Sequence, residues 1–418
     1  MVMNPRGYSL SAVFIAISAY SVINVSPAWS QSTSYEQPPT FTAAQILPFE
    51  LVRSSHHSVE SVVLNDGFIN TYQMVTKFGT YTVHSTDLLK IRVREIAAAA
   101  ALEEKSGAGT MLTAAGKTVV KPLKTGKDLI TKPGRTVKNT FRGVGRFFGR
   151  VGAGMAKTDT QGESMVGSLT GAGTAKRQLA YKFGVDPYTQ FEPLRQQLAS
   201  LSAASALGGT ATGVGMAFVT GGAGVAITVG SGSENLRALL RDKTAAELEK
   251  IGRRRLAGMN ADQISIDSFY RSRQLTPADK AIMVEALNRL GNAQNRGDFI
   301  RRAAEASTQK VAFQIRRRTE MTAAYHERVA RVSSIISLGG VPMARTANGI
   351  VAIFPIDHLS WTRAFADTVS AVNRGRKMLA GSPRVDMLIP GTASKRAVAK
   401  LKKNGWRLQQ EAGALLGG

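Results

Sequence analysis

The sequence contains no cysteine, which excludes disulfide bonds, thiolate metal ligands and a cysteine nucleophile. Stability must therefore come from the burial of apolar side chains, and the chain is long enough to form two or three hydrophobic cores. Acidic residues are also scarce, since 29 Asp and Glu stand against 54 Lys and Arg and give a formal net charge of +25. A charge of this size predicts an anionic partner or surface.

Charge is nearly absent from the N-terminus, where Arg6 precedes an apolar stretch from about residue 10 to residue 25. Pro27 and the triplet Ala28-Trp29-Ser30 follow, which predicts a signal peptide over residues 1–30 with cleavage before Gln31. The alternative is an uncleaved anchor, although the apolar core is short for a bilayer span. We expect export to the periplasm or cell envelope, or secretion. There anionic lipid or an envelope polymer is available as a partner, and nucleic acid is disfavoured.

The mature N-terminus changes character near residue 50. Residues 31–50 are rich in Ser, Thr and Pro, and this composition predicts a flexible leader. Residues 58–85 then alternate between apolar and polar, with breaks at Asn65-Asp66-Gly67 and near Gly79. This pattern predicts three short antiparallel strands. Thr86-Asp87 is expected to cap a helix that ends near residue 107, so that residues 51–107 form a small β-meander with one helix.

Residues 108–160 are basic and rich in glycine, with ten Lys and Arg and one acidic residue between Lys117 and Arg150. On a helical wheel the cations from residue 135 onward occupy one face, and Val and Phe side chains occupy the other. Such a helix is typical of a membrane interface. The alternative is an amphipathic helix docked on the protein's own core. The predicted lipid- or anion-binding residues are Lys117, Lys121, Lys124, Arg135, Lys138, Phe141, Arg142, Arg146, Phe147, Phe148 and Arg150.

Residues 161–335 are expected to be helical. Two helices surround the turn Gly184–Pro187, and no charged residue occurs from Gln196 to Ser233. Small residues recur every four positions over 205–221, as in close helix pairs. This stretch is interpreted as a buried helical pair, a membrane-inserting segment or a surface loop, and helix–helix self-association through 205–221 is an expected partner interaction. Thr276-Pro277 predicts a helix start, and a long helix is expected from about residue 298 to residue 334.

The C-terminal residues 336–410 return to a strand pattern, and residues 411–418 form a tail. Asn348-Gly349 is a strong hairpin signal, and Asp357 is expected to cap a helix that reaches about residue 379. A strand, a second helix and a last strand follow, so the order is β-β-α-β-α-β. Trp361 and Trp406 are expected in the core of this separate α/β unit. The loop 390–394 either binds an anion at a helix N-terminus or simply caps that helix.

Motifs for catalysis and cofactors are weak. The stretch MLTAAGKT, residues 111–118, lacks the first glycine of a phosphate-binding loop, and no Gly-x-Ser-x-Gly nucleophile motif is present. His56, His57 and His84 are weighed as zinc ligands against ordinary strand residues. We expect no cofactor and no metal, the catalytic residues are unknown, and whether the chain is an enzyme is left uncertain, with the balance against.

The sequence as a whole therefore predicts an α+β, multidomain protein with a β-meander, a helical centre and a C-terminal α/β layer. The expected function is that of an exported, basic, non-enzymatic envelope protein that associates with anionic membrane surface through the basic segment. One alternative is a periplasmic hydrolase or ligand-binding enzyme with its site in the C-terminal layer. Another is a secreted binder of polyanions or nucleic acid.

Overall fold

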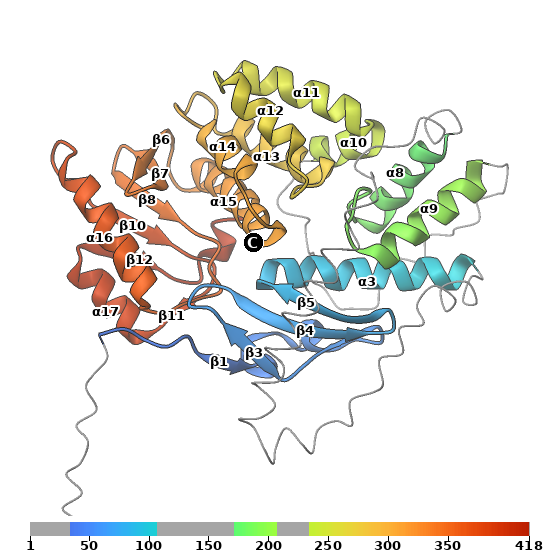
Figure 1. Ribbon diagram of the computed structural model, residues 1–418, viewed down its shortest axis with the longest axis horizontal. Coiled ribbons are helices and arrows are strands. Elements are labelled where there is room, and N and C mark those ends of the chain that lie inside the picture. Colours follow the sequence, from blue (N-terminus) through green and yellow to red (C-terminus); the bar gives the residue numbers. More distant parts are fainter. Residues whose placement is uncertain (1–33, 107–170, 207–233, 418) are drawn as a thin grey trace, which may run out of the picture. The chain divides into compact units, whose positions relative to one another are not determined.

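The computed structural model describes residues 34–106, 171–206 and 234–417. Helices and strands follow one another along the chain as an N-terminal sheet, a helical region and a C-terminal sheet (Figure 1). The α+β class predicted from the sequence is therefore confirmed. Because the predicted signal peptide, the basic segment 108–160 and most of the uncharged stretch lie outside the described residues, predictions about them are not tested.

The N-terminal sheet is antiparallel throughout and is organised around one central strand. In chain order the elements are β1 (Thr40–Thr42), α1 (Ala43–Ile46), α2 (Phe49–Val52), β2 (His57–Val59), β3 (Val62–Asn65), β4 (Asn70–Thr76) and β5 (Gly79–His84). β5 pairs along one edge of β4, while β2 and β3 pair with different parts of its other edge. β1 extends the sheet beyond β3.

One face of this sheet is covered by α3 (Thr86–Ser106), the helix predicted after the meander. Tyr72 and Met74 of β4 are fully buried and belong to the same apolar cluster as Leu89 and Ile96 of α3. Val75, which points to the opposite face, is 40% exposed. The alternation of burial along β4 explains why the sequence pattern in this region could be recognised.

Two expectations for the N-terminal region were wrong in detail. The segment predicted as a flexible leader contains β1 and α1, and Ala43 and Leu47 are buried in the core beneath the sheet. The stretch predicted as three strands contains four, because the chain breaks between Val59 and Val62 to pair with two parts of β4. Short elements of this kind are stabilised by their partners in the sheet, so local composition is a poor guide to them.

The helical region follows in two described parts. Its helices are α8 (Ala172–Phe183), α9 (Glu192–Ala206), α10 (Glu234–Asp242), α11 (Ala245–Ala257), α12 (Gln263–Arg271), α13 (Pro277–Arg289), α14 (Asp298–Ala304) and α15 (Gln309–Arg328). The two helices predicted around residues 184–187 are α8 and α9, and Gly184 ends α8 in a left-handed conformation. The predicted helix start at Thr276 is confirmed, because its side chain accepts a hydrogen bond from the Asp279 amide.

The long helix expected over 298–334 was wrong. It is divided into α14 and α15 by residues 305–308, and the Thr308 hydroxyl accepts a hydrogen bond from the Val311 amide at the start of α15. α15 ends at Arg328, and the chain then enters a strand. The apolar residues of that strand, Val332 and Ile335, also fit a helical spacing, which is why the sequence pattern extended the helix too far.

The C-terminal sheet is mixed. Its elements, with those that cover it, are β6 (Val332–Leu338), β7 (Val341–Thr346), β8 (Gly349–Ile353), β9 (His358–Leu359), α16 (Arg363–Lys377), β10 (Val385–Leu388), β11 (Thr392–Ala393), α17 (Lys395–Lys403) and β12 (Trp406–Gln409). The strand order is β12-β10-β8-β7-β6, in which β6 to β8 are antiparallel and β10 pairs in parallel with both β8 and β12. β9 and β11 form a separate parallel pair.

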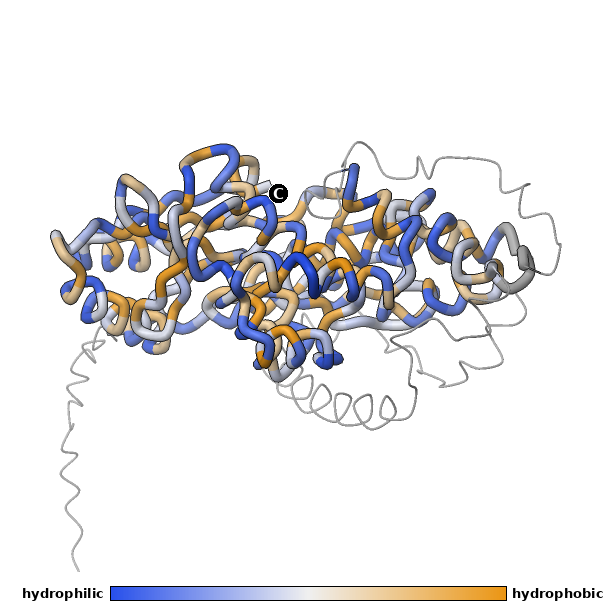
Figure 2. Tube along the Cα trace, turned by 90° about the horizontal axis from the view of Figure 1, so that it is seen from above, coloured by the Kyte–Doolittle hydropathy of each residue, from blue (hydrophilic) through white to orange (hydrophobic). Residues whose placement is uncertain are grey.

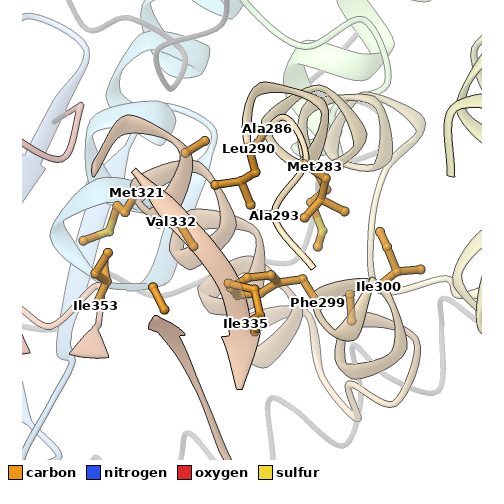
Figure 3. Close-up of a cluster of buried hydrophobic side chains, with 14 of the residues drawn as sticks. Met283, Ala286, Leu290, Ala293, Phe299, Ile300, Met321, Val332, Ile335 and Ile353 are labelled. Atoms are coloured by element: carbon orange, nitrogen blue, oxygen red, sulfur yellow. The ribbon is translucent and has the colours of Figure 1, made fainter. Parts of the chain in front are cut away.

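Both faces of the C-terminal sheet are buried. Ile350 and Ala352 of β8 pack with α16 and α17, as do the two predicted core tryptophans. Val351 and Ile353, which alternate with them, face the helical region. Figure 3 shows this second interface, where strand residues such as Ile335 and Ile353 meet helix residues such as Phe299. The two parallel connections run through α16 and α17, which therefore lie on the same face, as right-handed crossovers require.

The expected role of Asp357 as a helix cap for α16 was wrong, because Thr362 caps that helix. Asp357 instead accepts hydrogen bonds from the amides of Asn70, at 2.9 Å, and Thr86, at 3.1 Å. It therefore joins the C-terminal layer to β4 and to the first turn of α3. Ser394 caps α17, which confirms the capping interpretation of the loop at 390–394.

The described residues from Glu36 to residue 417 belong to one compact unit. Contacts cross the predicted domain boundaries: Phe68 packs against the C-terminal core, and Arg317 of α15 forms an ion pair with Asp87 of α3 at 2.8 Å. Whether residues 336–410 fold alone stays a prediction. In the described ranges no helix is both long and apolar enough to cross a membrane, and Figure 2 shows polar and apolar residues alternating along the helices.

Candidate functional site

The lipid- or anion-binding residues predicted from sequence, from Lys117 to Arg150, all lie outside the described residues. The small-residue stripe over 205–221 falls outside them as well, apart from the last positions of α9. The membrane-binding role of these residues therefore stays a prediction from the sequence. The described residues present two other features that can bind a ligand: a large cavity between the N-terminal and helical regions, and a cationic surface on the C-terminal layer.

The cavity has a volume of about 990 Å³. Five helices surround it: α3, α8, α10, α13 and α15, with further residues from β5 and from the loop between α8 and α9. Its walls are largely apolar. The apolar side chains are Leu88 and Ile91 from α3, Val185 from the loop, Leu236 and Leu240 from α10, Ile282 from α13 and Phe313 from α15. A cavity of this size and lining is typical of a small-molecule site.

Basic side chains of the cavity wall are mostly neutralised by the protein itself. Arg92 pairs with Glu95, Arg237 with Glu234 and Arg241 with Asp242. Lys310 pairs with Asp66 at 2.8 Å, and Arg316 pairs with Asp279 at 2.8 Å. Arg177 donates to the Arg241 carbonyl and to the Thr174 hydroxyl. These contacts hold the walls together and explain most of the charge around the cavity.

Arg94 differs from the other basic residues of the wall. Its Nη1 donates to the Gly184 carbonyl at 3.3 Å, and it has no ion pair within the described residues. Burial, and secondarily the neighbouring charge of Arg237, lower the pKa of the Arg94 guanidinium. A half-buried cation beside a second cation is electrostatically unfavourable unless an anion joins them.

The cavity wall also contains a carboxyl group that titrates near neutral pH. Asp186 accepts hydrogen bonds from the Thr276 hydroxyl at 2.9 Å and from the Tyr188 amide at 2.7 Å. Burial, and secondarily the negative charge of Asp279, raise the pKa of Asp186 to about 7. The carboxyl is therefore partly protonated at neutral pH, and its charge depends on the pH around the protein.

The triplet Arg316-Arg317-Arg318 in α15 is part of the interior. Arg316 and Arg317 are both buried and both pair with Glu320, which is buried too. Arg318 donates to the Pro342 carbonyl and lies over the Phe354 ring. Burial, and secondarily the charge of Arg302, lower the pKa of Arg318 to about 9. The triplet connects α15 with α3, α13 and the C-terminal sheet, so its charges are structural.

The cationic surface lies where the C-terminal ends of α16 and α17 meet. Asn373 of α16 donates to the Asn404 side chain at 3.3 Å, and Arg376 donates to the Gly405 carbonyl at 3.4 Å. Figure 1 shows the two helices side by side on the C-terminal sheet. Six cations in their last turns make up what we call the C-terminal cationic face: Arg374, Arg376, Lys377, Lys400, Lys402 and Lys403.

Within the described residues, none of these six cations forms an ion pair with an acidic side chain. The chain has no Asp or Glu between Asp367 and Asp386, or between Asp386 and Glu411. Asp386 itself pairs with Arg384 and Arg407, outside the six. Met378 follows directly after Lys377 and is 87% exposed. The face therefore combines uncompensated positive charge with an exposed apolar side chain.

Histidines do not form a metal site in the described part of the chain, where no group of His, Asp and Glu could hold a metal ion. His57 is buried, and its two ring nitrogens lie 2.7 Å from the Ser54 hydroxyl and 3.1 Å from the Leu51 carbonyl. The His84 ring nitrogen lies 3.1 Å from the Thr71 hydroxyl across the sheet. Both side chains thus have local partners within the N-terminal region.

Comparison of the chain with protein-family models, with curated proteins and with solved structures found no match.

Proposed function

We propose that this chain is an exported, non-enzymatic envelope protein that associates with anionic membrane surface. The observation that carries the proposal is the C-terminal cationic face, six unneutralised cations beside the exposed Met378. Each Lys or Arg contributes about 1 kcal/mol near an anionic bilayer. The basic segment from Lys117 to Arg150, with its three phenylalanines, supports the same conclusion from sequence.

Charge balance supports the proposal independently of that segment. The described residues alone carry 42 Lys and Arg against 26 Asp and Glu. In the stretch from Arg363 to Arg407 the ratio rises to eleven against two. Positive charge is therefore concentrated on the C-terminal layer, which is the arrangement expected of a surface that faces an anionic partner.

The test is co-sedimentation of the full chain with vesicles of phosphatidylcholine, either pure or mixed with phosphatidylglycerol. We expect binding to the mixed vesicles alone, weakened by salt. The variant Arg374→Gln/Lys402→Gln/Lys403→Gln should bind at least tenfold more weakly, because three charges are lost at about 1 kcal/mol each. Unchanged binding would remove the cationic face from the proposal.

A matched control loses the same charge elsewhere. Lys250, Arg254 and Arg271 are exposed on the helical region, and their replacement by Gln should leave vesicle binding nearly unchanged. If both triple variants lose binding equally, net charge alone is responsible, and the protein is a general polyanion binder. Competition with a soluble polyanion such as heparin distinguishes that outcome further.

The sequence prediction for the basic segment is tested in the same assay. Replacing Phe141, Phe147 and Phe148 with Ser keeps the charge and removes the apolar face, and it should weaken binding more than Arg142→Gln/Arg146→Gln does. A buried phenylalanine contributes about 1.5–3 kcal/mol, more than a screened surface charge. If the serine variant binds as well as the unaltered chain, the basic segment does not enter the bilayer.

The predicted signal peptide is tested separately. Protein purified from the cell envelope should have the intact mass of a chain that begins near Gln31.

A further inference from the structure

The cavity of the helical region is not explained by attachment to a membrane surface. Its volume of about 990 Å³ is at the upper end of the range for ligand pockets. Water is a poor occupant for the apolar parts of such a space, because their side chains offer no hydrogen bonds. An organic molecule with a substantial apolar part fits the walls better.

Arg94 indicates what the rest of that molecule must be. Its guanidinium donates a hydrogen bond to the Gly184 carbonyl, forms no ion pair with another described residue, and lies close to the charge of Arg237. An oxyanion placed there would neutralise a half-buried guanidinium, and such charge-assisted hydrogen bonds are the strongest kind available. The acidic groups of the wall, such as Asp186 and Asp279, already have partners of their own.

Helix geometry places the apolar wall next to this cation. Leu88, Ile91 and Arg94 follow one another at intervals of three residues along α3, so they lie along one side of the helix, and all three line the cavity. The distance along the helix from Arg94 to Leu88 is about 9 Å. Leu236 and Leu240 are four residues apart on α10 and therefore also lie along one side of their helix. The cavity therefore has a cationic end and an apolar track that leads away from it.

We propose that this cavity binds a single amphiphilic anion, with its oxyanion head group on Arg94 and its apolar chain between α3 and α10. A long-chain carboxylate and an acyl-chain phosphate share this chemistry. The binding takes place inside the described unit and does not depend on the C-terminal cationic face. The proposal therefore stands apart from the proposed membrane association.

The experiment uses the full chain and the fluorescent fatty acid cis-parinaric acid, displaced by dodecanoate, dodecyl phosphate or dodecanol. We expect saturable binding of one molecule per chain. An anionic head group should be preferred over the alcohol by about tenfold or more, as a charge-assisted hydrogen bond implies. The ratio between carboxylate and phosphate identifies the head group.

Arg94→Gln should weaken binding of the anions about tenfold and leave the alcohol unchanged, so that the preference disappears. Arg94→Lys should retain much of the preference. Ile91→Trp reduces the space in the cavity and should weaken the anions and the alcohol alike. Arg254→Gln removes the same charge from an exposed position of α11 and should change nothing.

Two results would overturn the proposal. One is the absence of saturable binding, which would also follow if another segment of the chain occupies the cavity. The other is an Arg94→Gln variant that melts like the unaltered protein and still prefers the anion. Vesicle sedimentation of the same variants separates this proposal from the previous one, because Arg94→Gln should leave sedimentation unchanged. The triple variant of the cationic face should in turn leave ligand binding unchanged.

Discussion

The two sheets of this protein differ in how many of their faces are covered. In the N-terminal sheet, burial alternates along β4, because α3 covers one face and the other is open to solvent. In the C-terminal sheet, four consecutive residues of β8, Ile350 to Ile353, are buried, because helices cover both faces. Parallel pairing of β10 goes together with this double cover, as is general for parallel strands.

This difference means that the same substitution should destabilise the two sheets by very different amounts. The residues Ile350 to Ile353 of β8 are buried on both faces of the sheet, whereas the side chains of β4 that point away from α3 are partly or fully exposed. Asp357 connects the two sheets, since it belongs to the C-terminal layer and receives hydrogen bonds from β4 and α3.

Val351→Asp is expected to have the largest effect. Val351 is 2% exposed and lies between the C-terminal sheet and the helical region. A carboxylate without a partner at this position is strongly unfavourable, so we expect the free energy of unfolding to fall by about 4 kcal/mol or more. Urea unfolding followed by circular dichroism measures the loss.

Val75→Asp provides the matched control in the N-terminal sheet. Because Val75 is 40% exposed, the same substitution there should change the free energy of unfolding by less than about 1 kcal/mol. Equal losses for the two variants would show that the second face of the N-terminal sheet is covered in solution, and the contrast between the sheets would no longer hold.

Asp357→Ala should have an intermediate effect, about 2 kcal/mol, because the amides of Asn70 and Thr86 both lose their acceptor. Asp357→Asn keeps one acceptor oxygen and should lose less. Hydrogen exchange locates the effect, since the Thr86 amide should exchange faster in the alanine variant. Unchanged protection of that amide would mean that another group caps α3.

The last prediction concerns pH. A carboxyl whose pKa is raised in the folded state binds its proton more tightly there than in the unfolded chain. Its contribution to stability is therefore present below the unfolded pKa and is lost as pH rises through the folded value. Burial raises the pKa of Asp186 to about 7 and that of Asp357 to about 6. The free energy of unfolding should thus fall as the pH rises from about 5 to about 8.

Asparagine variants assign this pH dependence to a region. Asp186→Asn, at the cavity, should flatten the curve of unfolding free energy against pH in its upper part, near pH 7. Asp357→Asn, between the two sheets, should flatten the same curve in its lower part, near pH 6. Urea unfolding at a series of pH values makes the measurement. A curve for Asp186→Asn that still falls through pH 7 by the full amount would contradict the assignment to the cavity.

Sequence patterns predicted the elements that contain strong local signals. The hairpin turn at Asn348-Gly349 and the helix start at Thr276 follow from turn or capping chemistry. The helix α3 was also predicted, but its expected cap at Thr86-Asp87 was wrong, because the Ser85 hydroxyl accepts the hydrogen bond from the Leu88 amide. The elements that were missed depend on distant partners. β1 is stabilised by pairing with β3, and β6 is stabilised by pairing with β7. Local composition therefore could not identify either segment as a strand.

The cavity had no signature in the sequence for a similar reason. Its walls come from residues 82–95, 177–190, 234–241, 274–282 and 307–316, and none of these stretches is unusual alone. In the sequence Arg94 resembles any other basic residue of an amphipathic helix, and only the structure shows that it forms no ion pair with another described residue. The predicted basic segment was the reverse case, because its pattern is local and therefore conspicuous.

The hydrogen bonds of Asp357 also bear on the timing of folding. The amide that begins α3 finds its acceptor 271 positions further along the chain. Domains are synthesised from the N-terminus, and contacts between distant residues form slowly because a long loop must close first. The hydrogen bonds of Asp357 with β4 and α3 can therefore form only after the last quarter of the chain has been synthesised. Such a delay would keep a newly made chain open for translocation in the export that we propose.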